Sequence, residues 1–144
     1  MNQNTVKNWM TKAQGDLKTG KDELKTRKPV VDAVCFHMQQ CVEKYLKAFL
    51  VFHNREFRKT HDLTELIEQC SELDPEFSKL FELNADRLTE YAIELRYPGD
   101  MIPPSFHDAK KAVQIAELVK KLVSRKLPRL GSKISKTESQ KKRS

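Results

Sequence analysis

The sequence predicts an all-α protein, an up-down bundle of four long helices plus one short helix, and three observations indicate this class. Apolar residues recur at steps of three and four along most of the chain, which is the period of one helical face. No segment alternates apolar and polar residues over any length, so no sheet is expected. The 144 residues include only four glycines, too few for a turn-dense β protein.

The bundle is predicted to be organised around a central helix at residues 30–52, VVDAVCFHMQQCVEKYLKAFLVF. Its apolar residues span more than the ~100° stripe of a surface helix, so other helices should surround it on most sides. Glu43, Lys44 and Lys47 lie inside the run and argue against a membrane span. Together with Gln39 and Gln40 these residues form a polar strip, in which Glu43 and Lys47 are spaced to pair. The strip is either a solvated face or the surface that a partner or ligand approaches.

The first helix should run over residues 5–24, where apolar residues form one stripe and Asn4 or Thr5 is available as the N-cap. Gly20 lies in that stripe and would permit a neighbouring helix to approach closely, at a cost of ~1 kcal/mol in helix propensity. Pro29 suits the first position of the central helix.

Two helices are predicted after a polar loop at residues 53–61. Asp62 followed by Glu65 resembles a capping box that starts the short helix. Asp74–Pro75 combines an N-cap with a proline at the first helical position, and the fourth helix should run from there to Leu95. The sequence YPGDMIPP then ends it, because its prolines and glycine do not fit a regular element.

The last helix should begin with a second capping box, Ser105 with Asp108, and end at Leu127–Pro128. Residues 1–125 would form the helical domain, and residues 126–144 a basic disordered tail without apolar period. The tail holds seven basic residues and one acid, so it carries +6 of the net charge of +7. The net charge of the whole chain therefore argues for RNA binding by the tail alone. The alternative is that the lysine-rich tail only keeps the protein soluble.

Composition sets the expected compartment and chemistry. The N-terminal MNQNTVKNWM lacks the apolar region of a signal peptide, so a cytoplasmic protein is expected. Cys35, Cys41 and Cys70 form no C-x-x-C pair and are interpreted as small core residues. The four histidines are far apart, so no metal site is predicted, and no glycine-rich phosphate loop or other cofactor motif is present.

Two segments are candidates for binding an anion. In the first, Arg55, Arg58, Lys59, Thr60 and His61 directly precede a predicted helix N-terminus, a place suited to a phosphate. The alternative is that this segment only caps the helix.

The second candidate is Arg96–Tyr97 at the predicted end of the fourth helix. Arg96 either satisfies the terminal carbonyls of its own helix or presents its planar fork to a phosphate.

Three of these segments resemble the HEPN domain (higher eukaryotes and prokaryotes nucleotide-binding) over roughly residues 4–125. They are CFHMQQCVEKYLKAFL at 35–50, KTHDL at 59–63 and LRYP at 95–98. The resemblance implies an all-α bundle that pairs as a homodimer. It also implies a prokaryotic setting, often beside a minimal nucleotidyltransferase in a toxin–antitoxin pair.

Many HEPN proteins are metal-independent ribonucleases whose signature is an arginine followed, after four to six residues, by a histidine. Here Arg96 matches the arginine, but His107 follows only after ten intervening residues. The resemblance therefore favours a nucleotide- or partner-binding module. Its binding residues would be Arg96, Tyr97, Lys59, Thr60 and His61, with the polar strip of Gln40, Glu43, Lys44 and Lys47. The alternatives are a ribonuclease that uses Arg96 and His107, and a structural homodimer without ligand.

Overall fold

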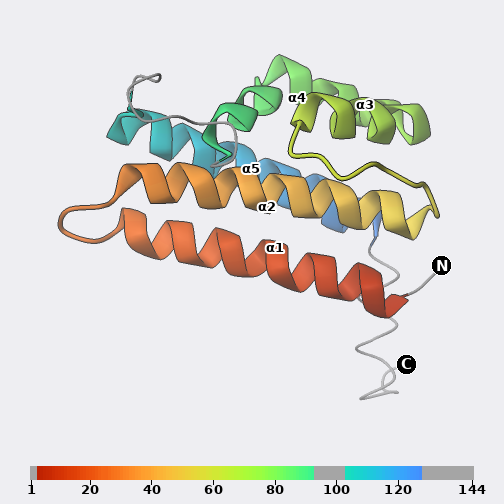
Figure 1. The fold of residues 1–144 in the computed structure, drawn as a ribbon, viewed down its shortest axis with the longest axis horizontal. Helices are drawn as coiled ribbons and strands as arrows, with labels where there is room; N and C mark the ends of the chain where they lie inside the picture. The colour runs from red at the N-terminus through yellow and green to blue at the C-terminus, as the bar shows by residue number, and fades with distance from the viewer. Residues whose placement is uncertain (1–2, 93–102, 128–144) are drawn as a thin grey trace.

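The structure is a computed structural model that describes residues 3–92 and 103–127 of the chain. Within these ranges every regular element is helical (Figure 1). In chain order the elements are α1 (Gln3–Leu24), α2 (Val31–Phe52), α3 (Leu63–Leu73), the 3-10 helix η1 (Pro75–Ser78), α4 (Lys79–Glu82), the 3-10 helix η2 (Ala85–Tyr91) and α5 (Phe106–Lys126). The predicted all-α class is confirmed.

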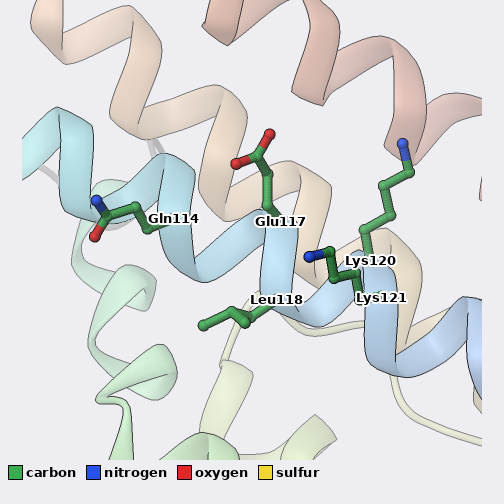
Figure 2. Close-up of a pocket in the computed structure, with 5 residues that line it drawn as sticks. All are labelled: Gln114, Glu117, Leu118, Lys120 and Lys121. Carbon is green, nitrogen blue, oxygen red and sulfur yellow. The ribbon is translucent and has the colours of Figure 1, made fainter.

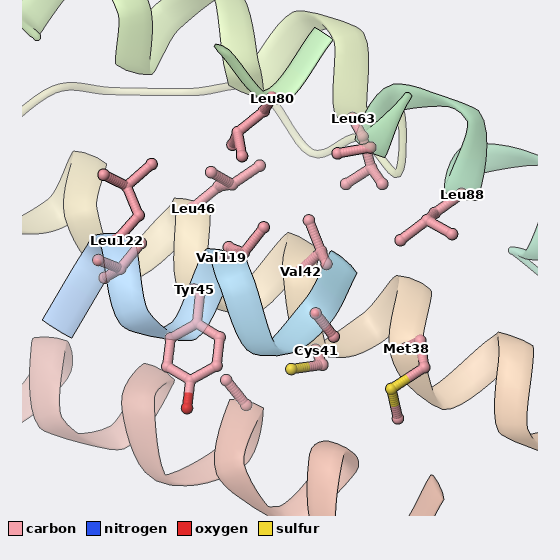
Figure 3. Close-up of a cluster of buried hydrophobic side chains, with 14 of the residues drawn as sticks. Met38, Cys41, Val42, Tyr45, Leu46, Leu63, Leu80, Leu88, Val119 and Leu122 are labelled. Carbon is pink, nitrogen blue, oxygen red and sulfur yellow. The ribbon is translucent and has the colours of Figure 1, made fainter. Parts of the chain in front are cut away.

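The central helix of the fold is α2, which contacts α1, α5, α3 and η2. Figure 1 shows α1 along one side of α2, and α3, α4 and η2 as a layer on the opposite side. In Figure 3, Val42 and Leu46 point toward the side chains of that layer, while Tyr45 points toward α1. Each fully buried side chain of this size contributes about 1.5–3 kcal/mol. The predicted central helix, covered on most sides, is confirmed.

The fourth helix is not continuous, and this part of the prediction was wrong. Residues 75–91 form η1, α4 and η2, and the chain turns between α4 and η2 at Asn84, which has a left-handed φ of 62°. Asparagine tolerates this conformation better than most residues. Ala85, Leu88 and Tyr91 are spaced by three, so a 3-10 helix places them on one face, and Ala85 and Leu88 are buried. Leu95 lies outside the described residues.

The predicted caps are only partly confirmed. Ser105 and Asp108 form the expected capping box at the start of α5. Asp74 accepts a hydrogen bond from the Glu76 N–H and precedes Pro75, as predicted. Asp62 caps α3 by accepting from the Thr64 N–H.

The capping box predicted at α3 is absent, because Glu65 pairs with Arg58 instead of turning back to the N-cap. The predicted positions of Asn4, Thr5 and Pro29 were also wrong. α1 already begins at Gln3, and Val30 is the N-cap of α2. The Val30 N–H donates to the Glu23 carboxylate at 2.8 Å, which holds this residue in an extended conformation outside the helix.

The three cysteines are free and buried, as predicted. Burial raises the pKa of Cys41 to about 12, so its thiol stays protonated at neutral pH. None of the described helices combines the length and apolar character that a membrane crossing requires.

The C-terminal end of α5 is bound to η1 by ion pairs. Lys126, predicted to begin the tail, is the last residue of α5 and pairs with Asp74 and Glu76, each at 2.8 Å. Arg125 also pairs with Glu76 at 2.6 Å, and hydrogen bonds from these two cations lower the pKa of Glu76 to about 2. Residues 128–144 of the predicted tail lie outside the described residues.

Gly20 lets α1 and α2 approach closely, as predicted. A Cβ at this position would collide with the Cε of Met38, whereas a Cβ at Gly15 would meet nothing within 4 Å. Both glycines lie in α1, so each lowers the helix propensity by the same amount. The two positions differ only in the space available to a side chain.

We therefore expect Gly20→Leu to lower the free energy of unfolding by about 1–3 kcal/mol, because the side chain overpacks the α1–α2 contact. Gly15→Leu is the matched control and should leave stability unchanged or raise it by up to about 1 kcal/mol. Chemical denaturation of both variants measures the difference. Equal stability of the two would contradict the close contact at Gly20.

Candidate functional site

The polar strip of α2 contains a buried row, Gln39, Glu43 and Lys47, spaced by four residues. The side chains of Glu43 and Lys47 expose only 5% and 8% of their area, and their carboxylate and ammonium groups are 2.7 Å apart. The predicted ion pair is present, but the interpretation as a solvated face was wrong for Glu43 and Lys47, whereas Gln40 and Lys44 are half-buried. Trp9 of α1 contacts Lys47, and Phe57 and His61 of the loop at residues 53–62 contact Lys47 and Glu43, respectively.

Glu43 has three hydrogen-bond donors. Lys47 donates to one carboxylate oxygen at 2.7 Å, and the amide of Gln39 donates to the other at 2.9 Å. The Nδ1 of His61 lies 2.9 Å from that second oxygen. Burial alone would raise the pKa of Glu43, but the hydrogen bonds from Lys47, His61 and Gln39 outweigh it and hold the pKa below its ordinary value. Glu43 is therefore an ionised carboxylate in the interior.

The ammonium of Lys47 is also packed against two aromatic rings. Its Nζ lies 5.5 Å from the ring centroid of Trp9 on α1 and 5.5 Å from that of Phe57 in the loop. Such cation–π contacts partly replace the water that the charge has lost. The contact with Phe57 thus links the position of the loop to the charge of Lys47. No pattern in the sequence revealed that Trp9 and Phe57 contact this charge.

His61 reaches solvent, since its side chain is 34% exposed. The loop around it is ordered by local hydrogen bonds. The Thr60 hydroxyl accepts from the Asp62 N–H at 3.0 Å, and the Gln39 amide donates to the His61 carbonyl at 3.4 Å. A buried carboxylate thus fixes the orientation of a partly exposed imidazole, an arrangement suited to hydrogen bonding or proton transfer.

The other predicted members of the polar strip lie beside this network. Gln40 joins it indirectly by donating to the Gln39 side chain at 2.7 Å. Lys44 belongs to a second cluster, in which Asp16 of α1 pairs with Lys44 at 2.6 Å and with the Nδ1 of His37 at 2.8 Å.

Most cations of the predicted anion site are neutralised. Arg55 pairs with Glu72 at 2.7 Å, and Arg58 makes a bidentate contact with Glu65. Lys59 is exposed and has no ion-pair partner among the described residues. Only Lys59, Thr60 and His61 of that segment therefore remain as residues that a ligand would meet.

The remaining predicted site residues lie elsewhere. Arg96 and Tyr97 fall outside the described residues. His107 is exposed in the first turn of α5, and no contact links it to the Glu43 network within the described part of the chain. In the same part, no group of three or more His, Cys, Asp or Glu side chains has the arrangement to hold a metal ion.

We expect Glu43→Gln to lower the free energy of unfolding at pH 7 by about 3–5 kcal/mol, because it leaves the ammonium of Lys47 buried without a carboxylate. The folded pKa of Glu43 is lower than its unfolded value of 4.5. The native carboxylate therefore stabilises the fold above that pH, and the difference between parent and variant should shrink as the pH falls through the folded pKa.

Chemical denaturation at several pH values measures both effects. Glu65→Gln is the matched control, because it breaks an exposed pair with Arg58 and should cost no more than about 1 kcal/mol. If Glu43→Gln does not fold, the double variant Glu43→Gln/Lys47→Met should recover stability. An equal loss of stability in Glu43→Gln and in Glu65→Gln would show that burial of the Glu43–Lys47 pair is unimportant.

Comparisons with known proteins give a family assignment. A model of the HEPN domain matches residues 6–127, which is most of the 144-residue chain. Searches of curated proteins and of solved structures found no match. The match includes the central helix and the loop with His61, and it confirms the resemblance drawn from the three sequence motifs. The chain belongs to the HEPN domain family.

Proposed function

We propose that this HEPN domain is a nucleotide- or partner-binding module. It would act in the cytoplasm as a homodimer, together with a minimal nucleotidyltransferase in a toxin–antitoxin-like pair. The observation that carries the proposal is the contact between Glu43 and His61, in which a buried carboxylate holds a partly exposed imidazole at 2.9 Å. The order of the chain supports a binding role, because the exposed Lys59 and the half-buried Thr60 directly precede His61.

The residues of the proposed site have two different roles. Lys59, Thr60 and His61 would contact a phosphate or a partner, and Arg96 and Tyr97 stay predicted members of the same site. Glu43, Lys47 and Gln40 would act as positioning residues, since the first two are buried and Gln40 is bound to Gln39. Lys44 would support the neighbouring contact between α1 and α2 through Asp16.

Isothermal titration calorimetry with AMP, ADP, ATP and GTP tests the proposal. We expect at least one nucleotide to bind and His61→Ala to weaken that binding by roughly 10- to 100-fold. This range corresponds to one lost hydrogen bond to a charged group, about 1.5–3 kcal/mol. His53→Gln is the matched control because His53 is an exposed histidine of the same loop.

Two results would count against this function. The first is a His53→Gln variant that loses as much affinity as His61→Ala, which would make the effect unspecific. The second is the absence of heat with every nucleotide, together with failure to co-purify with a nucleotidyltransferase encoded by a neighbouring gene.

A metal-independent RNA endonuclease is the second candidate function. The exposed position of His107 in the first turn of α5 favours it. In such an enzyme His107 would transfer protons, and Arg96 would stabilise the charge that develops on the phosphate. The ten residues between Arg96 and His107 exceed the spacing of the ribonuclease signature, which is why binding is proposed first.

If the endonuclease hypothesis is correct, the protein should cleave single-stranded RNA in the presence of EDTA. Arg96→Ala and His107→Ala should each abolish cleavage, while Lys121→Ala, on the exposed surface of α5, should not. An inactive parent protein, or unchanged cleavage by either of the first two variants, would remove the hypothesis. Loss of thermal stability in Arg96→Ala without any change in ligand binding would instead support a purely structural homodimer.

A further inference from the structure

A groove with a volume of about 410 Å³ lies between η2 and the N-terminal half of α5. This volume is within the range of pockets that hold small ligands. None of the residues of the Glu43 network lines the groove. Tyr91 and Pro103 both line it.

The groove owes the apolar part of its lining to the break in the predicted fourth helix. The left-handed turn at Asn84 separates α4 from η2 and leaves Leu83 with 42% of its area exposed at the rim. The 3-10 spacing then places Leu88 and Tyr91 on one side of η2, and both line the groove. Ile115 of α5 lines it from the other element.

Two cations line the groove from different elements, Arg87 on η2 and Lys111 on α5. Both are exposed, and neither makes an ion pair with any other described residue. By contrast, Arg55, Arg58 and Arg125 are all paired with glutamates.

Two carboxylates also line this groove, and neither forms an ion pair with Arg87 or Lys111 among the described residues, although the charge of Lys111 does act on Asp108. Asp108 is engaged in the capping box with Ser105, and those hydrogen bonds lower its pKa. Glu90 is exposed at the rim and makes no ion pair with the described residues.

We propose that this groove is a binding site for a small organic anion with a flat apolar body. Arg87 and Lys111 hold the anionic group, because neither has an ion-pair partner among the described residues and a guanidinium and an ammonium form strong charge-assisted hydrogen bonds to a carboxylate or phosphate. Tyr91, Leu83 and Ile115 contact the apolar body, which a bare inorganic anion does not have. Glu90 accepts a hydrogen bond from a hydroxyl or amino group of the ligand.

A second hollow on α5 makes a useful comparison. It is lined by Gln114, Glu117, Leu118, Lys120 and Lys121, which Figure 2 shows along a single helix. No opposing wall faces them among the described residues, and Glu117 is already paired with Lys21. This surface lacks the two-sided arrangement of the groove, and Lys121 therefore supplies a control lysine on the same helix as Lys111.

Titration of the full chain with 8-anilinonaphthalene-1-sulfonate, a fluorescent aromatic anion, tests the proposal. We expect saturable binding, and a dissociation constant at least tenfold higher in Arg87→Ala/Lys111→Ala. Leu83→Glu should weaken binding as well, because it places a negative charge at the exposed rim. Lys121→Ala and His61→Ala should leave the dissociation constant unchanged, so that this site is distinguished from the proposed nucleotide site.

Competition identifies the source of the anion. Displacement of the dye by AMP supports a nucleoside phosphate, and displacement by benzoate supports an aromatic carboxylate. Displacement by inorganic phosphate as effective as by either compound would overturn the role of the apolar wall. Absence of saturable binding, or equal affinity in the parent and in Arg87→Ala/Lys111→Ala, would overturn the site itself.

Discussion

The buried ion pair between Glu43 and Lys47 is the constraint on which the candidate site depends. Removing two charges from water costs several kcal/mol per ion, and the pair is tolerated only when further hydrogen bonds and contacts compensate for that loss. Here Gln39, His61 and the ring of Trp9 provide them. These groups come from α1, α2 and the loop before α3. The need to compensate the two buried charges therefore fixes the positions of these three segments relative to one another. The exposed imidazole of His61 is positioned as a consequence.

Charge pairing also determines which cations of a basic chain are available to a ligand. The arginines of the loop are bound to glutamates of α3, so the cluster that looks cationic in the sequence is nearly neutral in the fold. Arg87 lies between Asp86 and Glu90 in the sequence, and Lys111 follows Lys110 three residues after Asp108, yet both line a groove without ion-pair partners in the described part of the chain. Local sequence charge is therefore a poor guide to the electrostatics of this surface.

Helical periodicity was sufficient to predict α1, α2, α3 and α5, because each has a continuous apolar stripe. It was insufficient for residues 75–91, since a spacing of three is compatible with both an α-helix and a 3-10 helix, and neither glycine nor proline marks the turn at Asn84. The polar strip was misinterpreted for a different reason. Its burial depends on Trp9 and Phe57, which are distant in the sequence and carry no signal for this contact.

The departure from a regular fourth helix has a physical consequence for function. A left-handed residue other than glycine costs of order 1 kcal/mol and persists only when its surroundings compensate for it. Leu80 and Leu88, on either side of Asn84, are both buried, so the turn lets two apolar side chains reach the core. The same turn separates α4 from η2 and forms the wall of the groove with Arg87. The packing that stabilises the irregular segment thus also places Arg87, which has no ion-pair partner among the described residues, beside α5.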